Sequence, residues 1–307
     1  MNNKSALVIG ATSFIGYHLI PSLSKIFSEV IATTYSSKLA LNISNVKSVK
    51  LNISDYKEVK GLIEQINPDV IYNLAGILSD ECVKNPMNCF KVNTIGTFNI
   101  LEVSRLLDIN LVVQLSSVSV FRKGIQEPVT DYSPLLLATE PYGATKQCNE
   151  ALSNSYRETY GLNAVSLRYG WIYGIGRKRG GSSFASSFIE DAFRKKSFVL
   201  PIAVGDWIYI KDVVKSLLLV LKKELKIGTY IIKGETKSTT DALNIVQTLI
   251  PGAKGQLVPL SPNSPVSRWA SMVDDYAARK DLNWKPDFNL KEGILDYIKL
   301  LTQHYTT

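Results

Sequence analysis

Short apolar runs alternate with stretches of helical spacing along the first half of the chain. Five runs are apolar almost throughout and have the length of strands: residues 6–10, 29–34, 49–53, 69–75 and 111–116. Three stretches between them carry apolar side chains at helical intervals: residues 14–27, 56–66 and 90–107. Strands that are apolar on both faces are typical of a parallel sheet covered by helices on both sides. The pattern therefore predicts an α/β architecture of strand–helix–strand units.

The pattern continues to residue 168 and then becomes mixed. A helix is predicted over residues 141–160 and a strand over 163–168. Beyond them we expect helices, one further strand and one Pro-, Gly- and Ser-rich loop: residues 184–195, 212–225, 294–303, 230–233 and 251–265. We expect residues 1–168 to form one domain to which residues 206–234 return. A smaller mixed region is expected from residues 169–205 and 235–307.

The composition narrows the classes of molecule that the protein is expected to bind. The 307 residues include 35 Lys and Arg against 27 Asp and Glu, a net charge of +8. The basic residues are spread along the chain, which favours attraction of anionic small molecules over nucleic-acid binding. No apolar run approaches the roughly 18 residues of a membrane span. No secretory signal is recognisable at the N-terminus, so a cytoplasmic location is expected.

Cysteine and histidine usage excludes several chemistries. Cys82, Cys89 and Cys148 are odd in number and show no CxxC spacing. This argues against a disulfide scaffold and a Cys-based zinc site, and makes a reducing compartment the default expectation. His18 and His304 are too few for a histidine-rich metal site, and neither is placed for a Ser-His-Asp hydrolase. The chemistry must therefore rest on other side chains.

A glycine loop joins the first predicted strand to the first helix. Gly10 and Gly16 flank Thr12, Ser13, Phe14 and Ile15, and Ser13 stands where a third glycine is usual. Such a loop lets the backbone and the helix N-terminus approach a pyrophosphate, which predicts a dinucleotide site.

The end of the second predicted strand selects the form of this dinucleotide. NAD would need an acidic residue there, and the run 32–38 has none. Thr34 and Lys38 instead offer a donor and a positive charge, which favours the 2′-phosphate of NADP over NAD.

Tyr142 and Lys146 are spaced i, i+4 and so share one helical face. A lysine cation favours the phenolate and is expected to lower the pKa of Tyr142, which makes it a usable base. Ser117 lies 25 residues earlier, at the carboxyl end of a predicted strand that borders the ligand crevice. Two other pairs share the spacing and are expected on solvated helix faces: Tyr56 with Lys60, and Tyr276 with Lys280.

These motifs together resemble the extended short-chain dehydrogenase/reductases, the NAD-dependent epimerase/dehydratase family. The resemblance covers nearly the whole chain and rests on eight segments: residues 10–16, 73–76, 91–101, 116–121, 142–146, 167–176, 206–213 and 281–286. It implies a Rossmann-like doubly wound parallel sheet with a smaller mixed C-terminal substrate-binding region. It also implies a nicotinamide cofactor, a small-molecule substrate and a homodimer.

The resemblance also implies roles for single residues. Tyr142 would be the general acid/base, Lys146 would hold the nicotinamide ribose, and Ser117 would bind the substrate oxygen. Asn93 would fix local backbone or water geometry. The remaining cofactor contacts would come from Asn52, Ile53, Leu74, Ala75 and Gly76, with Asn52 standing where the family usually has Asp.

Departures from the family pattern narrow the activity. Val118 and Ser119 stand where 4,6-dehydratases carry an Asp-Glu pair, and no histidine is placed for a Cys-His epimerase-reductase. Gly205 replaces the Arg that usually grips the nucleotide. Arg177, Lys178, Arg179 or Arg268 would then replace this grip, the alternative being that they are plain surface charge. We expect Arg179 and Arg268 to bind the substrate, together with Ser117 and Ser119.

We rank an epimerase or ketoreductase of a nucleotide sugar first. A dehydrogenase of a small hydroxy acid or L-threonine is the alternative, because residues 73–79 and 180–183, Trp269 and Asp274-Asp275 resemble the short-chain L-threonine 3-dehydrogenases. That type normally has an acidic residue at the position of Thr34 and lacks the run 173–176. A non-catalytic nucleotide-binding protein on the same fold is a third, remote hypothesis.

Overall fold

A seven-stranded sheet forms the centre of the protein. The computed structural model describes residues 4–306, with side chains described to residue 303. The strands lie in the order β10-β6-β5-β4-β1-β2-β3, and every neighbouring pair is parallel. They are β1 (Ser5–Ile9), β2 (Glu29–Thr34), β3 (Val46–Lys50), β4 (Val70–Asn73), β5 (Val112–Ser117), β6 (Ala164–Tyr169) and β10 (Thr229–Ile232).

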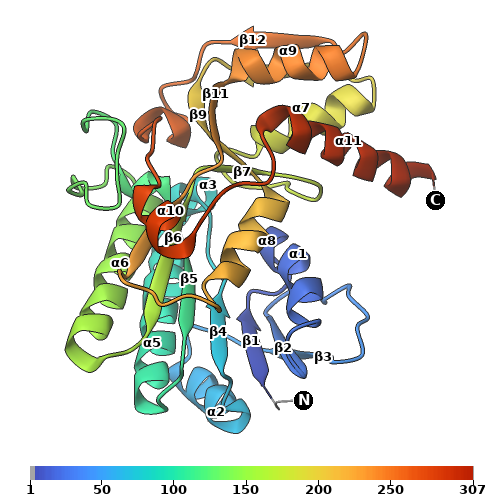
Figure 1. The fold of residues 1–307 in the computed structure, drawn as a ribbon. Coiled ribbons are helices and arrows are strands. Elements are labelled where there is room, and N and C mark those ends of the chain that lie inside the picture. Colours follow the sequence, from blue (N-terminus) through green and yellow to red (C-terminus); the bar gives the residue numbers. More distant parts are fainter. Residues whose placement is uncertain (1–3, 307) are drawn as a thin grey trace.

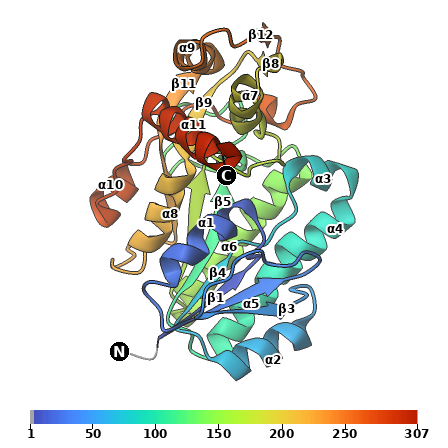
Figure 2. The same cartoon turned by 90° about the vertical axis from the view of Figure 1, so that its right-hand side faces the viewer.

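Helices cover both faces of this sheet (Figures 1 and 2). The helices of this part are α1 (Phe14–Leu23), α2 (Tyr56–Ile66), α5 (Gly96–Leu106), α6 (Pro141–Tyr160) and α8 (Ile210–Leu219). Side chains of β1 alternate between two cores: Ala6 and Val8 pack towards α1 and α8, while Leu7 and Ile9 pack towards α2 and α5. The predicted doubly wound α/β sheet is therefore confirmed.

A smaller mixed region lies over the carboxyl ends of the central strands (Figure 1). Its strands are β7 (Trp171–Tyr173), β9 (Val204–Tyr209) and β11 (Glu235–Ser238) in one sheet, and β8 (Phe198–Pro201) with β12 (Gly255–Val258) in another. Its helices are α7 (Phe184–Phe193), α9 (Thr239–Leu249) and α11 (Leu290–Thr306), and α10 (Tyr276–Leu282) contacts β10. None of the helices in residues 4–306 is long and apolar enough to cross a membrane.

The stretch expected to return to the central sheet does so in part. β10 pairs with β6, and α8 packs on α1, whereas β9 stays in the three-stranded sheet. The boundary at residue 168 between two domains stays a prediction.

The helix expected over residues 90–107 is present but begins earlier and is not regular. Helical backbone runs from α4 (Pro86–Phe90) through a π-helical turn at Lys91–Ile95 into α5, and a further short helix, α3 (Ser79–Lys84), precedes it. Such wide turns in helices are frequent at functional sites. Asn93 lies in this turn. Its side-chain amide is hydrogen-bonded to the backbone of Ile77 and to the side chain of Thr145.

Several element boundaries also differ from the sequence pattern. The strand expected at 49–53 lies at β3, because β3 pairs with β2 in a register that begins Val30 opposite Val46. Leu51 and Ile53 follow the strand and fill the core instead. The expected loop 251–265 contains β12 and is followed by a 3-10 turn that begins at its last residue, Pro265–Arg268. Another 3-10 turn, Val118–Val120, follows β5.

Two of the three cysteines form a disulfide, which the argument against a disulfide scaffold did not anticipate. Cys82 in α3 and Cys89 in α4 form a disulfide, and Cys148 is free. The chain reverses at Asn85 between the two helices, which brings the Cα atoms of Cys82 and Cys89 to 4.9 Å. A CxxC motif is therefore not needed for this bond, and the inference of a reducing compartment loses its basis.

A buried ion pair ties the sheet to α6. The guanidinium of Arg168 on β6 donates to the carboxylate of Glu150 on α6 at 2.8 and 2.9 Å. Ser116 on β5 donates to the same carboxylate at 2.5 Å. The Arg168 guanidinium also lies 4.7 Å from the ring centre of Phe121. The carboxylate of Glu150 thus links β5, β6 and α6 to one another.

Replacing Glu150 by Gln should destabilise the protein by about 3–5 kcal/mol, because the buried Arg168 loses its counter-charge. Urea unfolding monitored by circular dichroism measures the change. The matched control is Glu64→Gln, since Glu64 pairs with Lys60 at 3.5 Å on an exposed helix face. The control should cost less than about 1 kcal/mol. Equal losses in the two variants would show that burial of the Arg168 pair does not matter.

Candidate active site

The glycine loop lies where the strand order reverses, between β1 and β4. Gly10 has φ +81°, and a Cβ there would lie 2.7 Å from the backbone nitrogen of Ala75, so only glycine fits. Ser13 caps α1, because its hydroxyl accepts from the backbone N–H of Gly16 at 3.1 Å. The serine that replaces the usual glycine therefore builds the helix N-terminus that an anion would meet.

The other expected cofactor residues lie around this loop. Thr12 is exposed, Phe14 is half-buried and Ile15 is buried. At the end of β2, Thr34 is half-buried and Lys38 is exposed. These positions agree with a surface that a dinucleotide could cover.

Asn52 and Ile53, two of the expected cofactor contacts, have side chains with different partners. The Asn52 side chain accepts a hydrogen bond from the backbone of Ser54 at 3.1 Å. Ile53 is 7% exposed, and a Cβ at Gly96 would lie 2.6 Å from its Cδ1. Ile53 is thus largely used in packing against α5.

The segment after β4 is held by Asn93. Its Oδ1 accepts from the backbone N–H of Ile77 at 2.7 Å, and its Nδ2 donates to the carbonyl of Ile77 at 3.1 Å. Leu74 is buried and Ala75 half-buried, whereas Gly76 is exposed. A Cβ at Gly76 would lie 3.4 Å from Asn93 Oδ1 and 4.0 Å from Lys146 Nζ. Asn93 thus has the backbone-fixing geometry expected of it.

The start of α6 orients the catalytic candidates. Glu140 caps the helix by accepting from the backbone N–H groups of Tyr142 at 2.9 Å and Gly143 at 2.6 Å. One turn later, the Lys146 ammonium donates to the carbonyl of Leu115 at 2.7 Å, at the end of β5. Cap and anchor together fix which way the phenol and the ammonium point. Sequence reasoning missed Glu140, although an acidic residue before Pro is a recognisable N-cap signal.

The pKa of Tyr142 is raised, not lowered. Burial raises it to about 12, and the charge of Glu140 acts in the same direction. The charge of Arg177 and a hydrogen bond with Ser117 oppose the rise in the pKa of Tyr142. The expected lowering by Lys146 is therefore wrong in direction, because loss of water outweighs the cations.

Lys146 is itself affected by burial. Burial lowers its pKa to about 8, and the negative charge of Glu150 opposes that change. Its Nζ lies 5.6 Å from the ring centre of Tyr142. Lys280 lies 5.7 Å from the ring of Tyr276 in the same i, i+4 arrangement, but Tyr276 is 56% exposed. Burial, and not spacing, separates the site from this second pair.

The other residues expected on the substrate side lie in different surroundings. Arg179 is exposed and pairs with Glu81 at 3.7 Å, and Arg268 is half-buried. The Ser119 hydroxyl is buried without a hydrogen-bond partner among the described residues.

Arg177 was expected either to help grip a nucleotide or to be plain surface charge, whereas here its charge acts on Tyr142. Its guanidinium donates to Ser182 Oγ at 2.9 Å and to the carbonyl of Ile172.

The sequence profile of the NAD dependent epimerase/dehydratase family matches residues 6–232. A putative UDP-glucose 4-epimerase of Methanocaldococcus jannaschii is 31% identical, over 94% of this chain and 95% of the relative.

Two solved structures have the same fold. A partial consensus L-threonine 3-dehydrogenase matches with a TM-score of 0.91 at 22% identity, over 97% of this chain and 99% of the other. UDP-glucose 4-epimerase of Thermotoga maritima, solved with UDP-glucose, matches with a TM-score of 0.88 at 21% identity, over 98% and 99%. Both activities occur on this architecture.

Replacing Lys146 by Met should stabilise the protein at pH 7 and not at pH 10.5. The pKa of Lys146 falls from 10.5 to about 8 on folding, so between these values the unfolded chain binds more protons and stability rises with pH. Below pH 8 the full cost of the buried charge is present, on the order of 2–3 kcal/mol. Urea unfolding of both proteins at the two pH values measures the difference.

The exposed Lys280→Met is the control, and its effect on the free energy of unfolding should be small. An equal gain in unfolding free energy for Lys146→Met at both pH values would contradict the lowered pKa of Lys146. Such a gain would not depend on whether Lys146 is protonated.

Proposed function

Because the chain belongs to the NAD dependent epimerase/dehydratase family, we propose that it oxidises or reduces a secondary alcohol or ketone with a nicotinamide cofactor. The observation that carries the proposal is the half-buried Tyr142, whose phenol is hydrogen-bonded to Ser117 and lies one helical turn from Lys146. A non-catalytic nucleotide-binding protein would have no need of a phenol hydrogen-bonded in this way.

The residues around the loop fit a dinucleotide. The close approach at Gly10 and the N-terminus of α1 suit a pyrophosphate, and Lys146 next to Gly76 suits a ribose. When bound, the nicotinamide supplies the hydride donor or acceptor. Thr34 and Lys38 at the end of β2 support NADP over NAD.

Each side chain of the proposed catalytic group has a separate task. Tyr142 exchanges a proton with the reacting oxygen, and Ser117 donates a hydrogen bond to that oxygen as charge develops. With a pKa of about 12, Tyr142 is protonated at neutral pH and so is ready to act as the acid of a reduction. The positive charge of Arg177 favours the phenolate that remains.

One contact bears on the substrate. A Cβ at Gly205 would lie 2.5 Å from the indole ring of Trp171. That ring is 3% exposed and packs edge-on against Phe184 and Trp207 with centroids 5.1 and 5.3 Å away. The arginine that the family usually places here to grip a nucleotide therefore has no room.

We therefore rank a small hydroxy acid, such as L-threonine, above a nucleotide sugar, which reverses the order expected from the sequence. The relationship to a putative UDP-glucose 4-epimerase supports the nucleotide sugar as the second candidate.

Tyr142→Phe should lower turnover by roughly 10²–10⁴-fold, because the acid/base is lost. Cofactor affinity should change little, since the phenol oxygen belongs to the substrate side. Absorbance of the reduced nicotinamide at steady state and its fluorescence on binding measure the two effects. Tyr276→Phe is the matched control and should leave both unchanged. Turnover that survives in Tyr142→Phe would refute the mechanism.

A thermal-shift panel separates the substrate classes. With cofactor present, L-threonine or a related hydroxy acid should raise the melting temperature, and UDP, GDP and dTDP should not. Saturation at about 100 times Kd stabilises the folded state by about 2.7 kcal/mol, which is readily measured. NADP should shift the protein more than NAD at equal concentration. A large shift with a nucleoside diphosphate alone would restore the nucleotide sugar as first candidate.

A further inference from the structure

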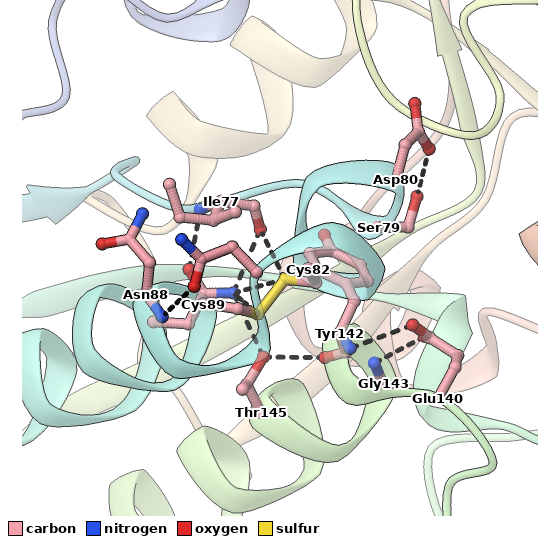
Figure 3. The surroundings of a disulfide bond; sticks show 12 residues. Ile77, Ser79, Asp80, Cys82, Asn88, Cys89, Glu140, Tyr142, Gly143 and Thr145 are labelled. Carbon is pink, nitrogen blue, oxygen red and sulfur yellow. Dashed lines mark hydrogen bonds between the residues drawn. A yellow bond between two sulfur atoms is a disulfide. The ribbon is translucent and has the colours of Figure 1, made fainter.

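The disulfide Cys82–Cys89 lies close to the start of α6, the helix that carries Tyr142 (Figure 3). It joins α3 to α4, the two short helices between β4 and the π-helical turn. Both cysteines are 0% exposed. The helices themselves lie at the surface, where Val83 and Met87 are 55% and 78% exposed.

The disulfide contacts the amide of Asn93. Asn93 Nδ2 lies 3.5 Å from Cys89 Sγ and 3.8 Å from Cys82 Sγ. The same nitrogen lies 3.1 Å from both the Ile77 carbonyl and Thr145 Oγ1. An amide has two N–H groups, and oxygen is the better acceptor. The amide group of Asn93 therefore packs against the two sulfur atoms, while its N–H groups bond to the oxygen atoms.

Asn93 connects the disulfide to the proposed catalytic groups. Thr145, which lies next to Asn93, donates to the carbonyl of Tyr142 at 2.8 Å. Asn149 one turn later donates to the carbonyl of Asn93 at 2.9 Å. On the other side, Asn93 Oδ1 lies beside the backbone of Gly76. A shift of Asn93 would thus reach both α6 and the strand end proposed to meet the cofactor.

Breaking the sulfur–sulfur bond forces such a shift. A covalent disulfide needs about 2 Å between its sulfur atoms. Two thiol sulfurs that are no longer bonded need the roughly 3.5–4 Å of ordinary non-bonded contact. Both sulfurs are fully buried and one side of the pair is the Asn93 amide, so the added volume presses on that amide.

We propose that the Cys82–Cys89 disulfide is a positioning element of the site, and that its reduction weakens cofactor binding and slows turnover. This inference rests on the proposed nicotinamide function. Reduction by a dithiol transfers two electrons to the protein: the protein S–S bond breaks and two S–H bonds form. The dithiol loses its two S–H bonds and becomes a cyclic disulfide. Local opening of α3 and α4 gives the reductant access.

The experiment compares the oxidised and the dithiothreitol-reduced protein. Binding of NADPH is followed by its fluorescence, and kcat and KM for the cofactor by its absorbance. Reduction should raise Kd and KM for NADPH by about tenfold. It should also lower kcat, since a misplacement of about 1 Å can cost about 10²-fold in rate. Far-UV circular dichroism should stay unchanged. Re-oxidation with a small-molecule disulfide should restore binding.

Two variants make the comparison specific. Cys82→Ala with Cys89→Ala leaves two small side chains behind Asn93, so its affinity should fall and should no longer respond to dithiothreitol. Cys148→Ala is the control, and it should respond to dithiothreitol as the unchanged protein does. Thiol counting under denaturing, non-reducing conditions should find one free thiol.

The outcomes are distinguishable. Equal NADPH affinity in the oxidised and reduced proteins, or a loss of melting temperature alone, overturns this inference and leaves the proposed function standing. Three free thiols in protein purified without reductant also overturn it. Failure of either form to bind NADPH or NADH removes the proposed function, and the inference with it.

Discussion

The hydrogen bond from the buried Lys146 ammonium to the Leu115 carbonyl sets the geometry of the site. It joins α6 to the carboxyl end of β5 at one point. With that contact fixed, Tyr142 lies one helical turn earlier on α6, and Ser117 lies two residues later on the strand. Because the ammonium is removed from water, the contact also needs the neighbouring Glu150 charge, which in turn holds Arg168. The chemistry and the packing of the sheet thus depend on the same few groups.

Much of the fold could be predicted from the sequence because it depends on local periodicity. The bounds of α2, α6 and β2 agree with the pattern of apolar residues, and the capped glycine loop is visible in the order of residues. The disulfide, the π-helical turn at Asn93 and the role of Arg177 could not be predicted. Each depends on contacts between segments that are remote in sequence or on the path of a reversed loop, which periodicity does not encode. The pairs Tyr142–Lys146 and Tyr276–Lys280 make the same point: equal spacing gives equal geometry, and only the fold decides which pair is buried.

The smaller region bears on the substrate through its aromatic core. Trp171, Phe184 and Trp207 pack together above the carboxyl ends of the sheet, and this cluster fills the space next to Gly205. The fold is shared with an L-threonine 3-dehydrogenase and with a UDP-glucose 4-epimerase. Fold similarity alone therefore does not identify the substrate, and the ranking proposed above rests on the local packing at Gly205.

The serine in the glycine loop has an entropic consequence. Glycine loses more conformational freedom on ordering than any other residue. Ser13 has fewer conformations to lose, and its hydroxyl is already bonded to the backbone of the first turn of α1. The disorder of this segment is therefore given up during folding and not when an anion arrives. A pyrophosphate that enters this loop meets a receptor that is already rigid.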